Sequence, residues 1–247
     1  MIRIKDYEEL KVRIVNWLKD YYWKYDIKAF VVGVSGGIDS AVVSTLCAET
    51  GFPTYVLTMP LHSKKGNTEL SDAHAKALSK KYSNVRVVNI DLSNTYESLL
   101  FDIDQDFVNN KLANANTKSR LRMVSLYQVA GSVGGIVVGT GNKVEDYGVG
   151  FYTKYGDGGV DIAPIADLYK SEVWELGEYL DVDQRIVDAK PTDGLWDDGR
   201  NDEDQIGATY VELEEAMENK TGVALNILEE YNKKNKHKME PIPTFKL

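Results

Sequence analysis

The stretch VVGVSGGIDS, residues 31–40, decides the fold of this chain. Its apolar start favours a buried strand, Ser35, Gly36 and Gly37 predict a tight turn, and Asp39 opens a helical apolar pattern. A helix N-terminus exposes unpaired backbone N–H groups and the positive end of the helix dipole, so it favours a phosphate-like anion. Glycine allows close approach of the phosphate and unusual backbone angles. The stretch therefore predicts a phosphate-binding strand–turn–helix unit.

The spacing in this loop differs from that of the common phosphate loops. No lysine precedes a Ser or Thr as in GxxxxGK[ST], and no third glycine completes GxGxxG. Instead an acid, Asp39, stands in the loop itself. Because an acid beside a polyphosphate requires a cation between them, we interpret Asp39 as a magnesium ligand. The alternative is an ordinary first-turn acid that pairs with the helix dipole.

Composition places the chain among globular proteins and excludes several classes. Its 247 residues, 43% hydrophobic and 27% charged, suffice for one α/β domain over residues 1–247. A formal net charge of −9 argues against nucleic acid or an anionic membrane as partner. The N-terminal residues lack an apolar signal core and no apolar run has the length of a bilayer span, so we expect a cytoplasmic protein. Cys47, the single cysteine, excludes an intrachain disulfide and a CxxC site.

Strand and helix patterns alternate along the first part of the chain, which predicts a mostly parallel sheet, Rossmann-like and doubly wound, with helices on both faces. In such a sheet, ligands bind beyond the carboxyl ends of the strands, where Ser35, Thr58 and Thr140 fall. The expected strands are 28–34, 54–59, 85–90 and 136–139, and the expected helices are 6–24, 39–51, 68–81, 94–110 and 117–134. After residue 150 we expect a structured glycine-rich loop over 151–165, an acidic loop over 191–205, and helices at 169–180, 183–188, 209–219 and 222–236.

The loop SGGIDS resembles the pyrophosphate loop of ATP pyrophosphatases, enzymes that cleave ATP to AMP and pyrophosphate. Relatives that thiolate transfer RNA usually need more cysteines, and lysidine-type modifiers need a basic surface. Glutamine-using relatives carry a fused amidase, for which the residues before Val31 are too few. Six further segments resemble, in order, those of ammonia-dependent NAD synthetases: SRLRM (119–123), VVGTGNKVE (137–145), FYTKYGDGGVDIAPI (151–165), LYKSEV (168–173), KPTDGL (190–195) and KHK (236–238).

This resemblance, which covers about residues 6–243, implies a fold of the adenine nucleotide alpha hydrolase type and a C–N bond-forming ligase. The implied substrates are ATP, deamido-NAD and ammonia, and the implied cofactor is Mg²⁺. The implied assembly is a homodimer that forms through the N-terminal helix and helix 117–134. Carried over by position, the ATP site would consist of Gly33, Val34, Ser35, Gly36, Gly37, Ile38, Asp39, Ser40, Thr140, Lys170 and Thr192. The deamido-NAD site would consist of Arg120, Lys154, Asp161, His237 and Lys238. Catalytic roles would fall to Asp39, Lys170 and, for ammonium, Asp157, and magnesium would be bound by Asp39 and Glu145.

Several of these assignments have alternatives. Glu145 follows from counting forward from Thr140, whereas counting back from Lys154 gives Asp146, because the intervening segment is one residue longer than usual. Arg120 and Lys238 could be ordinary surface charges and Asp161 a turn cap. Lys170, by contrast, begins a helix, where a lysine opposes the dipole, and that mismatch favours a functional role.

Two alternatives for the activity also remain open. Nicotinate mononucleotide could replace the dinucleotide as the acceptor in the same chemistry. A catalytically silent module that senses adenylates is the alternative from another class, and intact Asp39, Glu145 and Lys170 argue against it. We further expect the 191–205 loop to close over the bound substrates.

Overall fold

The computed structural model describes residues 3–62, 65–192, 194–195 and 201–246. Within them, a parallel sheet of four strands runs in the order β3-β2-β1-β4. The strands are β1 (Phe30–Gly33), β2 (Thr54–Thr58), β3 (Val85–Asn89) and β4 (Ile136–Val137). A single bridge from Val138 to Ile162 continues the pairing beyond β4. The parallel, doubly wound sheet predicted from the sequence is confirmed.

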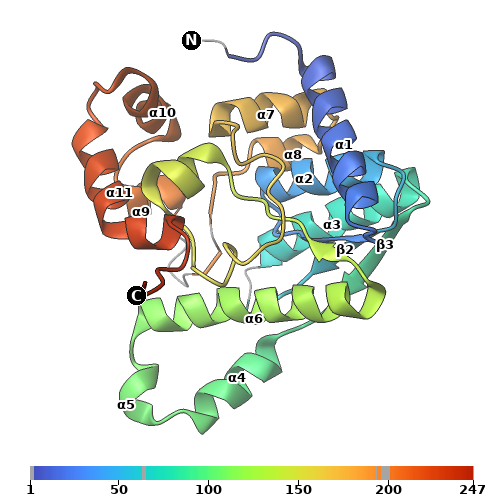
Figure 1. The fold of residues 1–247 in the computed structure, drawn as a ribbon. Coiled ribbons are helices and arrows are strands. Elements are labelled where there is room, and N and C mark those ends of the chain that lie inside the picture. The colour runs from blue at the N-terminus through green and yellow to red at the C-terminus, as the bar shows by residue number, and fades with distance from the viewer. Residues whose placement is uncertain (1–2, 63–64, 193, 196–200, 247) are drawn as a thin grey trace.

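Helices cover both faces of this sheet (Figure 1). One face packs against α1 (Tyr7–Lys24), α2 (Ile38–Glu49), α3 (Lys65–Lys81) and α7 (Lys170–Tyr179), and the other against α4 (Ser93–Asp102) and α6 (Lys111–Val133). The alternation of strand side chains produces this division. Phe30 and Val32 of β1 enter the cluster with α1, α2 and α7, whereas Val31 enters the cluster with α6.

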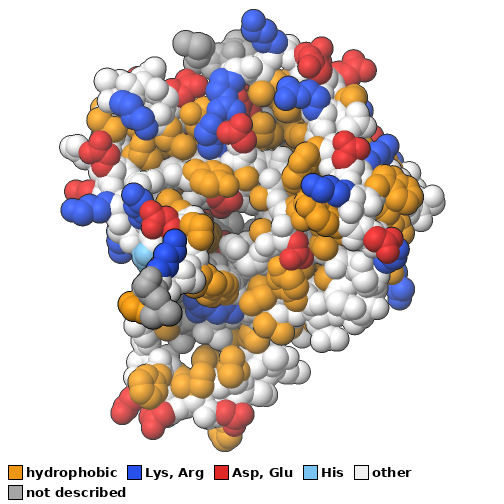
Figure 2. Space-filling model, in the orientation of Figure 1, with side chains coloured by type: hydrophobic (Ala, Val, Ile, Leu, Met, Phe, Trp, Pro, Cys, Tyr) orange, Lys and Arg blue, Asp and Glu red, His pale blue; other side chains and the backbone are white. Residues whose placement is uncertain are grey.

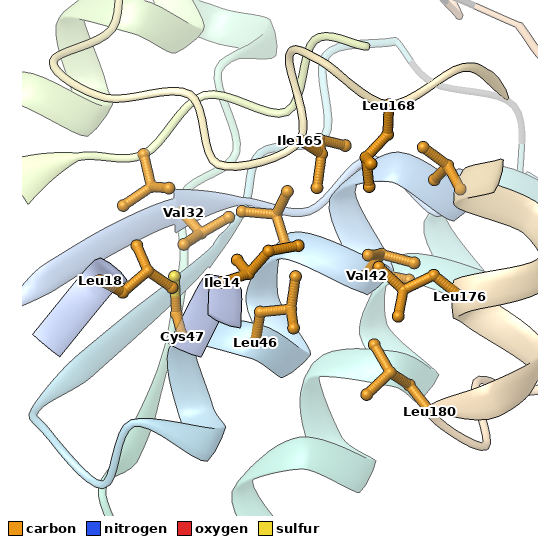
Figure 3. Packing of buried hydrophobic residues seen from close by; sticks show 14 of the residues in the cluster. Ile14, Leu18, Val32, Val42, Leu46, Cys47, Ile165, Leu168, Leu176 and Leu180 are labelled. Carbon is orange, nitrogen blue, oxygen red and sulfur yellow. The ribbon is translucent and has the colours of Figure 1, made fainter. Parts of the chain in front are cut away.

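The largest hydrophobic cluster lies between β1, α1, α2 and α7 (Figure 3). Cys47 of α2 is completely buried in it, beside residues such as Leu18 and Leu46. Burial raises the pKa of the Cys47 thiol above its ordinary value. Cys47 is therefore a core residue and not a nucleophile.

A second core lies in the C-terminal part of the chain. It joins a π-helix, η1 (Val144–Val149), to α9 (Asp202–Ile206), α10 (Tyr210–Asn219) and α11 (Leu225–Met239). Short helices α5 (Gln105–Val108) and α8 (Gln184–Val187) complete the described elements. None of the described helices is long and apolar enough to cross a membrane.

Four expectations about local structure are wrong, each for a local reason. The helix expected over 94–110 is interrupted at Ile103, which is extended, and Asp104 caps a separate α5. Helix α6 begins at Lys111 instead of 117, because the Asn110 side chain accepts a hydrogen bond from the N–H of Ala113 and starts the helix without an apolar stripe.

The other two wrong expectations concern strand β4 and the acidic segment 191–205. β4 has only two residues where four were expected, because its register with β1 ends at Val137 and Val138 forms an isolated bridge with Ile162. The segment 191–205 is not entirely a loop, because a capping box between Asn201 and Asp204 starts α9. Its closure as a lid falls on residues 193 and 196–200, outside the described residues.

Candidate active site

The phosphate loop connects β1 to α2 through hydrogen bonds of its own serines. The Ser40 hydroxyl accepts from the N–H of Ser35 at 3.2 Å and donates to the carbonyl of Gly37 at 3.0 Å, and the Gly37 N–H donates to the Ser35 hydroxyl at 3.2 Å. Gly36 has φ of +92°, a value that side-chain-bearing residues rarely adopt. Gly37, the N-cap of α2, provides no side-chain cap, so the first amides of this helix are available to an anion.

A lysine joins two carboxylates beside this loop. The Lys170 ammonium donates to Asp39 Oδ2 at 2.5 Å and to Glu145 Oε1 at 3.0 Å, and the lysine is only 2% exposed. Burial alone would lower the pKa of Lys170, but the two carboxylates raise it above its ordinary value, so the ammonium stays charged. Lys170 is the first residue of α7. Its unfavourable place at the positive end of the helix is therefore compensated by two negative charges.

The two carboxylates respond differently to burial. Burial would raise the pKa of Glu145, but Lys170 and a hydrogen bond from Tyr210 hold it below its ordinary value. For Asp39 burial outweighs the attraction of Lys170, and its pKa is raised. Glu145 is therefore the more firmly ionised carboxylate of the pair.

Asn142 and Tyr210 complete this charged centre, and the sequence analysis assigned a role to neither. Asn142, completely buried, donates from Nδ2 to Asp39 Oδ1 at 3.1 Å and accepts from the N–H of Glu145 at 3.1 Å. The Tyr210 hydroxyl donates to Glu145 Oε1 at 2.7 Å. The position of Asn142 just after a predicted strand could have indicated a role at the site. The capping box at the start of α10 indicates only where a helix begins, and gives no sign of a role for Tyr210.

The π-helix η1 separates Glu145 from Asp146. Glu145 reaches Lys170, whereas the Asp146 carboxylate lies against Gly141, so closely that a Cβ at residue 141 would overlap it. Burial, followed by the nearby charges of Glu145, Asp157 and Asp39, raises the pKa of Asp146 to about 8. The geometry therefore places Glu145 with Asp39 and Lys170, and leaves Asp146 as a neighbouring acid.

Asp157 lies in the glycine-rich loop, tied to α6. Its Oδ1 accepts from the Ser119 hydroxyl at 2.7 Å and from the Thr153 N–H at 3.0 Å, and its own N–H donates to the same hydroxyl at 2.9 Å. The two hydrogen bonds with Ser119 hold the loop against α6, and the one from Thr153 fixes the carboxylate within the loop. Asp157 is close enough to the charged centre for its charge to influence Asp146.

Four of the five residues expected to bind deamido-NAD lie together. Arg120 donates to the carbonyl of Lys154 at 3.3 Å, and Lys154 Nζ donates to the carbonyl of His237 at 3.2 Å. The Lys238 ammonium donates to the carbonyls of Gly150 and Tyr152, at 2.6 and 2.8 Å. The C-terminal end of α11 is thereby joined to the glycine-rich loop and α6.

The remaining predicted residues lie elsewhere. Asp161 stands at the edge of the sheet, where its carboxylate accepts from the N–H of Val137 at 2.7 Å and from the Tyr127 hydroxyl at 3.0 Å. Thr140, half-buried, follows β4 after Val138 and Gly139. The hydroxyl of exposed Thr192 accepts from the N–H of Gly194 at 3.2 Å.

The donor set suits a magnesium ion that is bound together with a nucleotide. Across the described ranges, no three His, Cys, Asp or Glu side chains are arranged to hold a metal by themselves. Magnesium, however, commonly takes one or two carboxylates, several waters and substrate phosphates. Asp39 and Glu145 share the Lys170 ammonium and lie beside the phosphate loop, and so provide that number of carboxylates.

Comparison with known proteins identifies the family of this chain. The family model described as NAD synthase matches residues 10–242. An NH(3)-dependent NAD(+) synthetase of Mycoplasmopsis pulmonis is 41% identical over 213 residues, 85% of this chain and 79% of that protein. One from Carboxydothermus hydrogenoformans is 37% identical over 94% of this chain and 95% of that protein. A solved NMN synthetase from Francisella tularensis superposes with a TM-score of 0.91 at 35% identity, covering 99% of this chain and all of that one. The chain therefore belongs to the NAD synthase family, with the fold of the adenine nucleotide alpha hydrolase type.

Proposed function

We propose that this protein is a ligase that amidates the nicotinate carboxylate of deamido-NAD with ammonia, converting ATP to AMP and pyrophosphate. The observation that carries the proposal is the buried cluster of Lys170, Asp39 and Glu145 beside the phosphate loop. Such a cluster suits the cleavage of a polyphosphate, because it combines a fixed cation with two hard oxygen donors. The family and its curated relatives support the same reaction.

The first step activates the carboxylate. A carboxylate oxygen attacks the α-phosphorus of ATP, the bond to the β-phosphate oxygen breaks, and a mixed anhydride with AMP forms as pyrophosphate leaves. The amides at the start of α2 would hold that pyrophosphate, and Lys170 would place its ammonium near the phosphate oxygens. Asp39 and Glu145 would hold Mg²⁺, which supplies neutralisation of the charge on the departing pyrophosphate.

The second step forms the amide. Neutral ammonia attacks the activated carbonyl, AMP leaves with the anhydride oxygen, and one proton of the attacking nitrogen is lost. Asp157 is a candidate to orient ammonium and to accept its proton, since its carboxylate is fixed against α6 and its charge reaches Asp146 beside the charged centre. Arg120, Lys154, His237 and Lys238 would bind the dinucleotide, whose phosphates are anionic.

A homodimer through α1 and α6, the two helices expected at the interface, is part of this proposal. Both carry exposed apolar side chains, among them Trp23, 69% exposed, and Val124, 57% exposed. Apolar side chains gather over α4, α5 and the start of α6 at the bottom of the view in Figure 2, where Phe101 is 84%, Phe107 71% and Leu112 59% exposed. Large exposed apolar groups of this kind favour an interface. Charges of both signs are mixed over the rest of this face.

The mononucleotide is a second candidate acceptor. The specific observation in its favour is the TM-score of 0.91 with the protein named NMN synthetase, over 99% of this chain. Both acceptors present the same nicotinate carboxylate, so the charged centre favours neither of them. Measured kcat/KM values for both, under the same ATP and ammonium concentrations, separate the two candidates. A clear preference for the mononucleotide would contradict our first choice.

The general test of the proposal is a balance of products. With ATP, ammonium and deamido-NAD, the protein should release one AMP and one pyrophosphate for each NAD formed. The variant Lys170→Met should abolish this release, whereas Lys143→Met, which loses an exposed pair with Asp167, should retain it. ATP binding without any AMP or pyrophosphate release would instead identify a silent adenylate-sensing module.

A further inference from the structure

The hydroxyl of Tyr210 is a buried polar group at the charged centre to which the proposed reaction assigns no role. Tyr210 is completely buried at the start of α10, and its hydroxyl donates to Glu145 Oε1 at 2.7 Å. An ionised carboxylate oxygen can only accept, so the hydroxyl is the donor in this hydrogen bond.

The ring of the same tyrosine contacts α7. The Lys170 ammonium lies 4.9 Å from the centre of the Tyr210 ring, and the indole of Trp174 packs edge-on against it at 6.0 Å and 84°. One side chain thus contacts both Glu145 on η1 and Lys170 on α7. Any displacement of Tyr210 would affect the two groups together.

Hydrogen bonds at the start of α10 fix the backbone of Tyr210. A capping box between Thr209 and Glu212 sets the first turn of α10, and the backbone N–H of Tyr210 donates to Glu203 Oε1 at 2.9 Å. The ring itself belongs to the C-terminal core, which also contains Val144 and Val149 of η1. Because η1 and α10 share this core, the distance from the hydroxyl to Glu145 is determined by packing.

Tyr210 and Lys170 both donate to the same oxygen of the Glu145 carboxylate, Oε1. Two donors on one oxygen restrict the rotation of the carboxylate about its terminal bond, and with it the direction of the second oxygen. If Lys170 turns toward a bound nucleotide, Tyr210 remains as the donor that keeps this orientation. A purely apolar ring would fill the same space without that restraint.

We propose that Tyr210 is a positioning residue for the magnesium ligand Glu145. It orients the carboxylate for the metal and couples the C-terminal helices to the phosphate loop. The proposal depends on the proposed function only through Asp39 and Glu145 as metal ligands. Partners that hydrogen-bond to metal ligands typically change metal affinity or activity 10–100-fold when they are removed.

The test compares Tyr210→Phe with Tyr231→Phe. Tyr231 packs against the same C-terminal core, and its hydroxyl donates to the Gln205 carbonyl at 2.9 Å, away from the charged centre. Each variant keeps its ring and loses one hydroxyl that donates a hydrogen bond inside the C-terminal core, so the pair controls for a general loss of stability. Mn²⁺ affinity is measured by electron paramagnetic resonance on the full chain with a non-hydrolysable ATP analogue, and the Mg²⁺ dependence of kcat is measured alongside.

We expect Tyr210→Phe to bind Mn²⁺ at least tenfold more weakly, to require correspondingly more Mg²⁺, and to regain most of its kcat when Mg²⁺ is saturating. Tyr231→Phe should remain within twofold of wild type in both measurements. A Mn²⁺ affinity of Tyr210→Phe within twofold of wild type would overturn the proposal, as would an equal loss in both variants.

The metal measurement also separates this proposal from the identity of the acceptor. It uses no deamido-NAD, so a wrong acceptor leaves the Mn²⁺ titration unchanged. Absence of Mn²⁺ binding by the wild type in the presence of the analogue would reject Asp39 and Glu145 as metal ligands, and the role of Tyr210 with them.

Discussion

Replacing Lys170 by Met tests the charged centre most directly. The substitution keeps the length of the side chain and removes the ammonium that pairs with Asp39 and Glu145. Breaking a buried ion pair on one side typically costs about 3–5 kcal/mol, because the remaining charge is left uncompensated. The carboxylates are themselves 15% and 17% exposed, so some water reaches them, and we expect a loss of about 3 kcal/mol at neutral pH.

The pH dependence of this loss has a definite sign. Without Lys170, burial raises the folded-state pKa values of Asp39 and Glu145 above those in the unfolded chain. Groups with raised folded-state pKa values contribute stability below the unfolded pKa and lose it as pH rises through the folded pKa. The deficit of Lys170→Met relative to wild type should therefore shrink toward acid pH and grow toward alkaline pH.

Urea unfolding of the two proteins between about pH 5 and pH 8 measures this difference. The control is Lys143→Met, whose ammonium pairs with an Asp167 side chain that is 88% exposed, and it should change the free energy of unfolding by no more than about 1 kcal/mol. A loss in Lys170→Met as small as that of the control would refute the reasoning. A deficit that grows toward acid pH would refute it equally.

Three further predictions address the metal ligand, a buried histidine and the phosphate loop. Glu145→Gln should reduce AMP formation at least tenfold and Asp146→Asn should leave most of it, since Glu145 is the one of these two acids that pairs with Lys170. The reverse result in a pyrophosphate-release assay would reassign the metal ligand. Burial lowers the pKa of His74 to about 4, so the neutral imidazole contributes stability above pH 6.5 that is lost as pH falls toward 4, about 3 kcal/mol in all. In urea unfolding, the variant His74→Gln should not show this acid-dependent loss of stability. Equal pH profiles for the variant and the wild type would contradict the prediction. Gly36→Ala should weaken ATP binding roughly tenfold in calorimetry, because alanine at φ of +92° costs about 1–2 kcal/mol; unchanged binding would show that the loop does not need this conformation.

Local patterns predicted the sheet and the elements around it well. Strands such as 54–59 consist of apolar β-favouring residues bounded by prolines, and the predicted range agrees with β2, Thr54–Thr58. The predictions failed where side-chain hydrogen bonds, and not hydrophobic periodicity, set the boundary. Asn110 and Asn201 start helices in polar sequence, and the π-helix η1 has no pattern that distinguishes it from a loop.

The sequence by itself determined the phosphate loop, the succession of strands and helices along the chain and the residue types expected at the site, because these depend on local spacing and on short motifs. Only the tertiary structure decided how those residues meet. Lys170 lies 131 residues from Asp39, and Tyr210 lies 65 residues from Glu145, so no local pattern relates them. The packing of α7 and α10 against η1 joins them, and that packing comes from the two hydrophobic cores on either side of the charged centre.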